Sequence, residues 1–67
     1  MPRTVLDIVQ ATGYASFDDA WRTAGLYHDD DAIYCYNVRL RLSDRMYVIE
    51  VYSGDTAYGS ELFHGYL

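Results

Sequence analysis

The feature that most constrains the fold is a change of hydrophobic period at Ile33. From Ile33 to Leu42 apolar side chains alternate along the chain, which is typical of a strand with one buried face. Ser43-Asp44 can form a tight turn, and residues 45–52 have the composition of the returning strand. The sequence therefore predicts an antiparallel hairpin as the centre of the fold.

A two-residue loop sets the register of this hairpin. On one face it pairs apolar side chains, namely Tyr36 with Val51, Val38 with Ile49 and Leu40 with Tyr47. We expect that face to be buried, because cross-strand apolar pairs stabilise a sheet and fix its register. The opposite face carries Asn37 with Glu50, Arg39 with Val48 and Arg41 with Met46, and is expected to be mixed and at least partly wet.

Two helix-start signals precede the hairpin. Thr4 and Ser16 are candidate N-caps, and each is followed three residues later by an aspartate, as in a capping box. Gly13 and Gly25 then stand where the two helices would end. The pattern predicts two short helices before the hairpin.

The remaining chain completes the predicted fold. Residues 53–55 form a turn signal, and residues 58–66 are expected to return as a third strand. Sixty-seven residues leave room for one domain. We predict an α+β fold with two short N-terminal helices packed on a three-stranded antiparallel β-meander. Besides the Tyr36 face of the hairpin, its core is expected to contain Leu6, Val9, Phe17 and Trp21.

Charge excludes some classes of function. The chain has ten acidic residues, five arginines and no lysine, for a formal net charge of −5. A phosphate backbone would be repelled, so direct nucleic-acid binding is not expected, whereas a basic protein surface would be complementary. Plain solubility is the alternative reason for such a charge. Cys35, the single cysteine, cannot form an internal disulfide, and no apolar run is long enough to span a membrane, so we expect a cytoplasmic protein without a membrane partner.

Catalytic and metal sites are not indicated. His28 stands beside three aspartates, but a calcium loop counted from Asp29 would have Ile33 in its fifth place. A nucleophilic site would need His28 or His64 within reach of a serine or of Cys35, in a pocket that a chain this short rarely encloses. We predict no catalytic residue, no metal site and no cofactor, and therefore not an enzyme.

Acidic residues and tyrosines outside the predicted core indicate a surface that binds a partner. Tyrosine brings a large contact area at little cost in rotamer entropy and is enriched at interface hot spots. The candidate partner-binding residues are Tyr14, Asp18, Asp19, Tyr27, Asp29, Asp30, Asp31, Asp55 and Glu61. Helix capping or a solvated loop is the structural alternative for the aspartates.

With Asp18-Asp19, the run from His28 to Asp31, Asp55 and Glu61 set among tyrosines, the chain resembles the small acidic anti-CRISPR proteins of phages and mobile elements in size and composition. The resemblance implies a monomeric or weakly dimeric inhibitor. Such an inhibitor docks on a basic nucleic-acid-binding surface of a type I CRISPR effector complex and blocks target DNA binding.

Two questions stay open at the level of sequence. Mimicry of DNA requires Arg39, Arg41 and Arg45 to lie apart from the acids; otherwise the inhibitor would be a steric blocker. The alternative function is a homo-oligomeric accessory protein. It would associate through a hairpin face with Met46, Val48 and Tyr52, or through the edge of the third strand.

Overall fold

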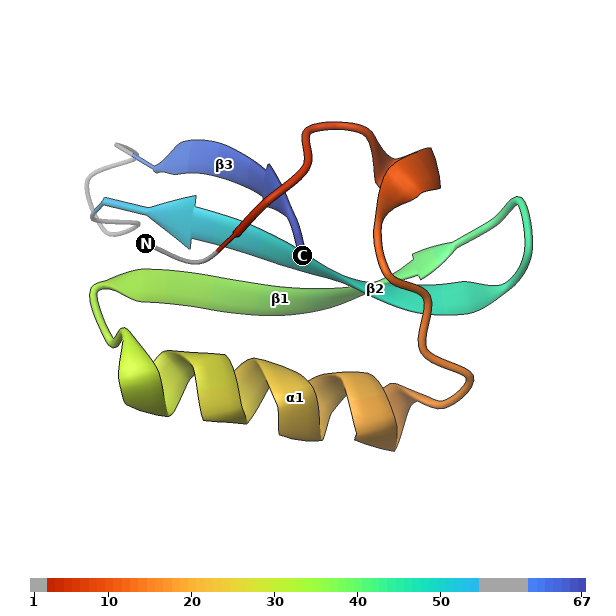
Figure 1. Cartoon of the computed structure of the whole chain (residues 1–67), viewed down its shortest axis with the longest axis horizontal. Coiled ribbons are helices and arrows are strands. Elements are labelled where there is room, and N and C mark those ends of the chain that lie inside the picture. The colour runs from red at the N-terminus through yellow and green to blue at the C-terminus, as the bar shows by residue number, and fades with distance from the viewer. Residues whose placement is uncertain (1–2, 55–60) are drawn as a thin grey trace.

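A computed structural model of the chain describes residues 3–54 and 61–67. Its elements are η1 (Ile8–Gln10), α1 (Phe17–Asp30), β1 (Tyr34–Arg41), β2 (Met46–Ser53) and β3 (Leu62–Tyr66). The three strands form one antiparallel sheet in the order β1-β2-β3, so the α+β class and the meander are confirmed. Figure 1 shows α1 running alongside β1, with the N-terminal segment near β3.

The β1–β2 hairpin has the predicted register. Tyr36 is opposite Val51, Val38 opposite Ile49, and Arg39 opposite Val48. The turn has four residues, 42–45, and not the predicted two, so Leu42 and Arg45 lie outside the strands; Arg45 adopts a φ of 57°, in the left-handed region. The alternation of side chains was sufficient to predict the register, although the turn is longer than predicted.

Helix α1 begins where the sequence predicts and ends later. The Ser16 hydroxyl accepts a hydrogen bond from the Asp19 backbone N–H at 3.2 Å, as an N-cap should. The prediction that Gly25 ends the helix was wrong, because α1 continues to Asp30. A helical glycine costs only about 1 kcal/mol relative to alanine. The turn after it packs the rings of Tyr27 and His28 against the sheet.

The predicted first helix is not present, which corrects the expectation of two helices. Instead Val5 is extended and pairs with Tyr66 of β3 through two backbone hydrogen bonds of 2.6 and 2.7 Å. Only the single 3-10 turn η1 forms, and Asp7 rather than Thr4 caps it, accepting from the Val9 N–H at 2.9 Å. Several side chains of this segment are β-branched and lose rotamer freedom in a helix, while the edge of β3 offers backbone partners.

The core is made of smaller side chains than predicted. Ala20 and Ala24 of α1 pack on Ile49 on one face of the sheet, and Ala11 packs with Val48 and Tyr66 on the other. The expected core residues lie largely in solvent: Leu6 is 77% exposed, Val9 69%, Trp21 58% and Phe17 46%. Since α1 turns its alanines to the sheet, the helix can approach closely, and its larger apolar side chains remain at the border of the contact.

The second face of the hairpin is drier than predicted. Arg39 is exposed, but Val48 and Glu50 are buried. The N-terminal segment covers this face and is held by Arg41, whose Nη1 donates to the carbonyl oxygens of Ile8 at 2.8 Å and Ala11 at 2.9 Å. A Val48 surface for self-association is therefore already occupied within the chain.

The third strand is confirmed over part of its predicted length. It spans Leu62–Tyr66, shifts register beside Tyr52 and pairs with β2. Residues 58–60 of the prediction lie outside the described residues.

Candidate partner-binding face of helix α1

Negative charge is concentrated on α1. Residues 17–31, the helix and its C-cap, contain five aspartates and Arg22, a formal charge of −4. The other 52 residues contain five acids and four arginines, a formal charge of −1. One element thus carries most of the −5 of the whole chain.

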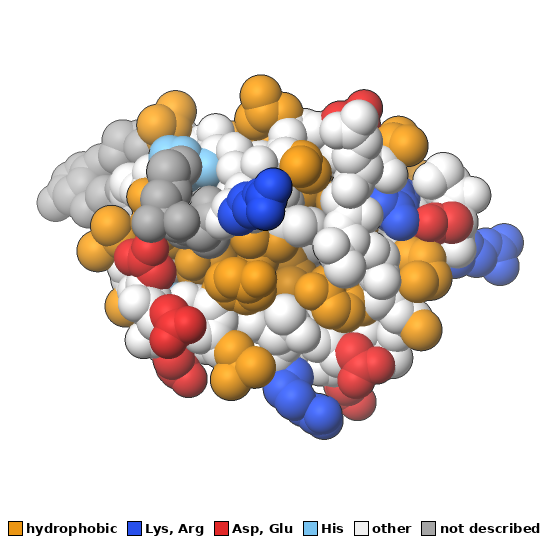
Figure 2. All heavy atoms as spheres, viewed as in Figure 1, with side chains coloured by type: hydrophobic (Ala, Val, Ile, Leu, Met, Phe, Trp, Pro, Cys, Tyr) orange, Lys and Arg blue, Asp and Glu red, His pale blue; other side chains and the backbone are white. Residues whose placement is uncertain are grey.

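The helical acids gather at the two ends of α1. Asp18 and Asp19 occupy its first turn, and Asp29 and Asp30 its last, with Asp31 as the C-cap. Eleven residues of helix place Asp18 and Asp29 about 16 Å apart along the axis. Figure 2 shows acidic side chains over both ends, with hydrophobic surface between them. The predicted acidic cluster is therefore two separate groups.

These acids also differ in direction. At 100° per residue, Asp18 and Asp29 lie within about 20° of each other around the axis, on the side of Trp21 and Gly25. Asp19 and Asp30 lie about 100° further round. All four are exposed, and none has an ion pair within the described part of the chain.

The two acidic groups have opposite effects on the helix. Asp18 and Asp19 stand near the positive end of the helix dipole, where carboxylates are stabilising. Asp29 and Asp30 stand near its negative end, where a carboxylate is destabilising. The helix dipole accounts for the first pair, whereas the stability of the helix gives no reason for the second.

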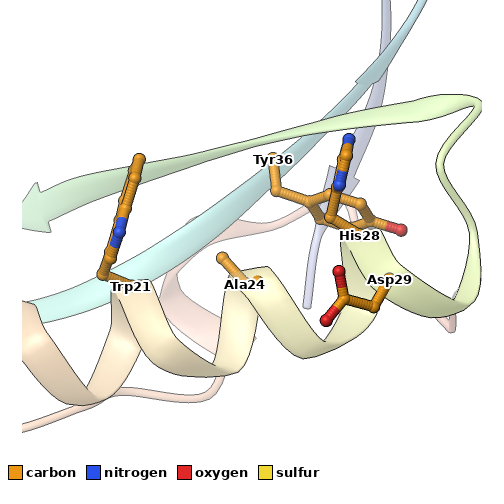
Figure 3. Close-up of a pocket in the computed structure, with 6 residues that line it drawn as sticks. Trp21, Ala24, His28, Asp29 and Tyr36 are labelled. Carbon is orange, nitrogen blue, oxygen red and sulfur yellow. The ribbon is translucent and has the colours of Figure 1, made fainter.

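An open groove lies between α1 and β1. It has a volume of about 320 Å³ and is lined by Trp21, Ala24, Gly25, His28, Asp29 and Tyr36. Figure 3 shows the rings of Trp21 and His28 rising from α1 toward β1, with Ala24 between them and the Tyr36 ring beside His28. Asp29 supplies a carboxylate at the same end as His28.

Aromatic contacts support the walls of this groove. The Trp21 ring stacks on Phe17, with centroids 5.9 Å apart and planes 13° from parallel, and Phe17 in turn meets the edge of Tyr47 at 5.8 Å. At the other end, His28 lies edge-on to Tyr36 at 6.3 Å. Ring pairs of this kind contribute about 0.5–1.5 kcal/mol beyond area burial, so the rings are held in place before any partner arrives.

The Tyr36 hydroxyl is buried beside the end of α1. Within the described residues its oxygen has no hydrogen-bond partner. Burial raises the pKa of Tyr36, and the negative charge of the nearby Asp31 raises it further. The phenol is therefore neutral at physiological pH and contributes an apolar wall with an unsatisfied polar end.

The other candidate residues are placed in different ways. Tyr27 is partly exposed near the Tyr36 ring, at 6.2 Å. Tyr14 is half-buried: it exchanges two backbone hydrogen bonds with Tyr47 and packs on the Ala24 side of the core. Glu61 is exposed just before β3, whose first residue pairs with Ser53 at the end of the sheet where β1 begins. Asp55 lies outside the described residues.

One serine and one histidine do come within hydrogen-bond distance. Ser53 Oγ lies 2.5 Å from His64 Nε2, and the Tyr34 ring is edge-on to the imidazole at 5.3 Å. A serine nucleophile needs its histidine oriented by a third group, commonly a carboxylate. No carboxylate binds His64 among residues 3–54 and 61–67, and the pair acts as a side-chain link between β2 and β3.

The arginines of the hairpin lie apart from the acids of α1. Arg39 and Arg41 are on the sheet face opposite the helix and are paired, with Glu50 at 3.2 Å and Asp44 at 2.7 Å. Arg45 lies in the turn after β1. The hydrogen bonds from Arg41 lower the pKa of Asp44, so this pair remains ionised at neutral pH.

Comparisons with protein-family models, with curated proteins and with solved structures find no match to this chain. Within the described ranges, no helix has the length and apolar character needed to cross a membrane. The same residues contain no group of three or more His, Cys, Asp or Glu side chains placed to hold a metal ion. The site is therefore interpreted from its own geometry.

Sequence reasoning found the acids of this face and missed its groove. Trp21 was assigned to the core because its spacing fits a buried helical stripe. Gly25, read as a helix end, is the position that opens the surface between the rings: a Cβ there would have nothing within 4 Å. A glycine inside a helical pattern, one turn from a tryptophan, was the available signal.

Proposed function

We propose that this protein is a non-catalytic inhibitor whose helix α1 docks on a basic nucleic-acid-binding surface of a larger complex and blocks nucleic-acid binding there. The observation that carries the proposal is the concentration of negative charge on α1 and its C-cap, −4 of a total of −5. A negative surface opposite a positive one accelerates association and selects the partner.

The C-terminal acids of α1 add to this support. Asp29 and Asp30 are exposed, have no ion pair in the described chain and oppose the helix dipole. Residues that destabilise their own fold are characteristic of functional sites. In the free protein these two charges destabilise α1, whereas in a complex they would pair with positive charges of a basic partner.

The density of charge favours a blocker over a full mimic of duplex DNA. Fourteen helical residues span about 21 Å, a length in which duplex DNA carries about 12 phosphates. Helix α1 and its cap present five carboxylates and one guanidinium. Arg39 and Arg41 lie apart from the helix, so Arg22 is the cation that shares the acidic face, and α1 has fewer than half the charges of DNA.

The resemblance to small acidic anti-CRISPR proteins directs the proposal to a type I CRISPR effector complex, which holds DNA on basic surfaces in the cytoplasm. Self-association receives less support: Val48 is buried under Ala11, and Val5 pairs with β3 at Tyr66. A monomer in sedimentation, independent of concentration, is the expected state.

Size-exclusion co-elution with purified type I surveillance complexes tests the proposal. We expect co-elution at low salt, weaker co-elution at high salt, and loss of target DNA binding by the occupied complex. The double charge reversal Asp29→Lys/Asp30→Lys should abolish co-elution while the circular dichroism spectrum stays unchanged. Absence of binding to every complex at both salts would reject this target class.

A further inference from the structure

The groove between Trp21 and His28 has chemistry that the acidic ends of α1 do not have. We infer that it is a receptor for one arginine side chain of the basic partner, so that the guanidinium enters between the rings and pairs with Asp29. This inference rests on the proposed function, since it names the group on the partner that α1 recognises.

The walls favour a flat cation. Tryptophan is the strongest cation–π partner among the aromatic side chains, and Trp21 as a residue is 58% exposed although Phe17 stacks on it. His28 stands seven residues further, about 10 Å along the helix, which leaves room for a planar group between the two rings. The lining residues include a carboxylate and no arginine.

The helix surface between the two rings carries only small residues. Between the rings α1 has Ala24, which is buried, and Gly25, which has no side chain. Any larger residue at 25 would project into free space beside Trp21, since a Cβ there meets nothing within 4 Å. The cavity of about 320 Å³ is at the small end of ligand pockets, which suits one side chain and not an extended ligand.

Charge selects arginine over an apolar side chain. Asp29 lines the groove and Asp18 lies on the same side of α1, so the approach to the groove is negative at both ends. Arginine is preferred to lysine because its guanidinium is planar, stacks on aromatic rings and binds a carboxylate with two parallel hydrogen bonds. The cation on α1 itself, Arg22, is exposed and does not line the groove.

Trp21 is the only tryptophan in the chain, so its fluorescence reports on the groove directly. The probes are short blocked peptides with one arginine, one lysine, one leucine or one citrulline, which has the shape of arginine without its charge. The arginine peptide should change the emission saturably, with a dissociation constant on the order of a few millimolar. Lysine should bind more weakly, and citrulline and leucine should give no saturable change at matched ionic strength.

Two variants assign any binding to the groove. Gly25→Leu should fill it and abolish the arginine response, whereas Gly25→Ala, which adds one methyl group, should keep most of it. Asp29→Asn should weaken arginine binding about two- to fivefold, while Asp19→Asn removes the same charge about 80° round the helix and about 15 Å along it and should leave it unchanged.

The inference is overturned by an equal response to citrulline or leucine, by lysine binding as tightly as arginine, or by no response to any peptide. Its failure can be told from failure of the proposed function. If Asp29→Lys/Asp30→Lys abolishes binding to the complex while the arginine peptide leaves Trp21 unchanged, docking stands and the arginine receptor does not.

Discussion

Two pairs of aspartates on one helix should respond in opposite ways to the same chemical change. Asp18 and Asp19 lie in the first turn of α1, and Asp29 and Asp30 lie in its last. Replacing each pair by asparagine removes two negative charges from a protein with a net charge of −5. Asp18→Asn/Asp19→Asn should lower stability, and Asp29→Asn/Asp30→Asn should raise it.

The magnitude follows from the helix dipole. A charge beside a helix end contributes about 0.3–1 kcal/mol at low ionic strength, favourable or unfavourable according to its sign. Each double variant should therefore shift the free energy of unfolding by about 0.6–2 kcal/mol, in opposite directions. Relief of general charge repulsion is similar in both variants and cancels in their difference, which should be at least about 1.2 kcal/mol.

Thermal unfolding followed by circular dichroism measures this difference. For a domain of this size, about 1.2 kcal/mol corresponds to a difference of about 5 °C or more in Tm. The difference should shrink at high salt, because exposed charges near helix ends are screened. If both variants shift the Tm equally and in the same direction, the acids at the C-terminal end do not destabilise α1. One support of the proposed function would then be removed.

Three further predictions concern residues of the sheet and the hairpin turn. Tyr36→Phe removes a buried hydroxyl that has no partner within the described residues and should raise the free energy of unfolding by about 1 kcal/mol; a loss of stability would indicate a hidden partner. Arg41→Ala should lower the Tm far more than Arg39→Ala, because it removes the hydrogen bonds that Arg41 donates to three main-chain carbonyl oxygens of the N-terminal segment, and equal shifts would contradict the anchoring role. Because Arg41 lowers the pKa of Asp44, their pair stabilises the fold above about pH 4 and this contribution disappears as pH falls below that value; an unchanged acid response in Asp44→Asn would refute it.

The hairpin was predictable because its signals are local. Alternating side chains from Ile33 to Leu42 and a turn centred on Ser43-Asp44 leave one register that pairs apolar residues, and that register is present although the turn is four residues long. The Ser16 cap was predictable for the same reason, since it needs only a backbone N–H three residues away.

The N-terminal segment was not predictable from local signals. Thr4 and Asp7 fit a capping box, but the backbone partner of Val5 is Tyr66, at the other end of the chain. A pairing over sixty residues outweighed a helix signal that lacked good helix formers. The core was misassigned for a related reason, because either Ala20 and Ala24 or Phe17 and Trp21 could have faced the sheet.

The candidate site was predictable in composition and not in arrangement. Acids at Asp18 and Asp29 are visible in the sequence, but their alignment on one side depends on α1 continuing through Gly25. The groove required in addition that Trp21 be turned away from the core. The length of α1 and its rotation about its axis are both set by packing on β1 and β2. They decide which acidic and aromatic side chains lie on this surface.

The most direct test of the account measures whether acidic α1 displaces DNA. Binding of labelled target DNA to a purified type I complex is titrated with wild-type protein, with Asp29→Lys, and with the control Asp7→Lys. The control makes the same change of charge at an exposed acid outside α1, and its circular dichroism spectrum must match that of the wild type because Asp7 also caps η1. We predict that Asp29→Lys weakens inhibition at least about tenfold while wild type and control remain similar. Equal loss in both variants, or no inhibition by wild type, would contradict the claim that helix α1 carries the function.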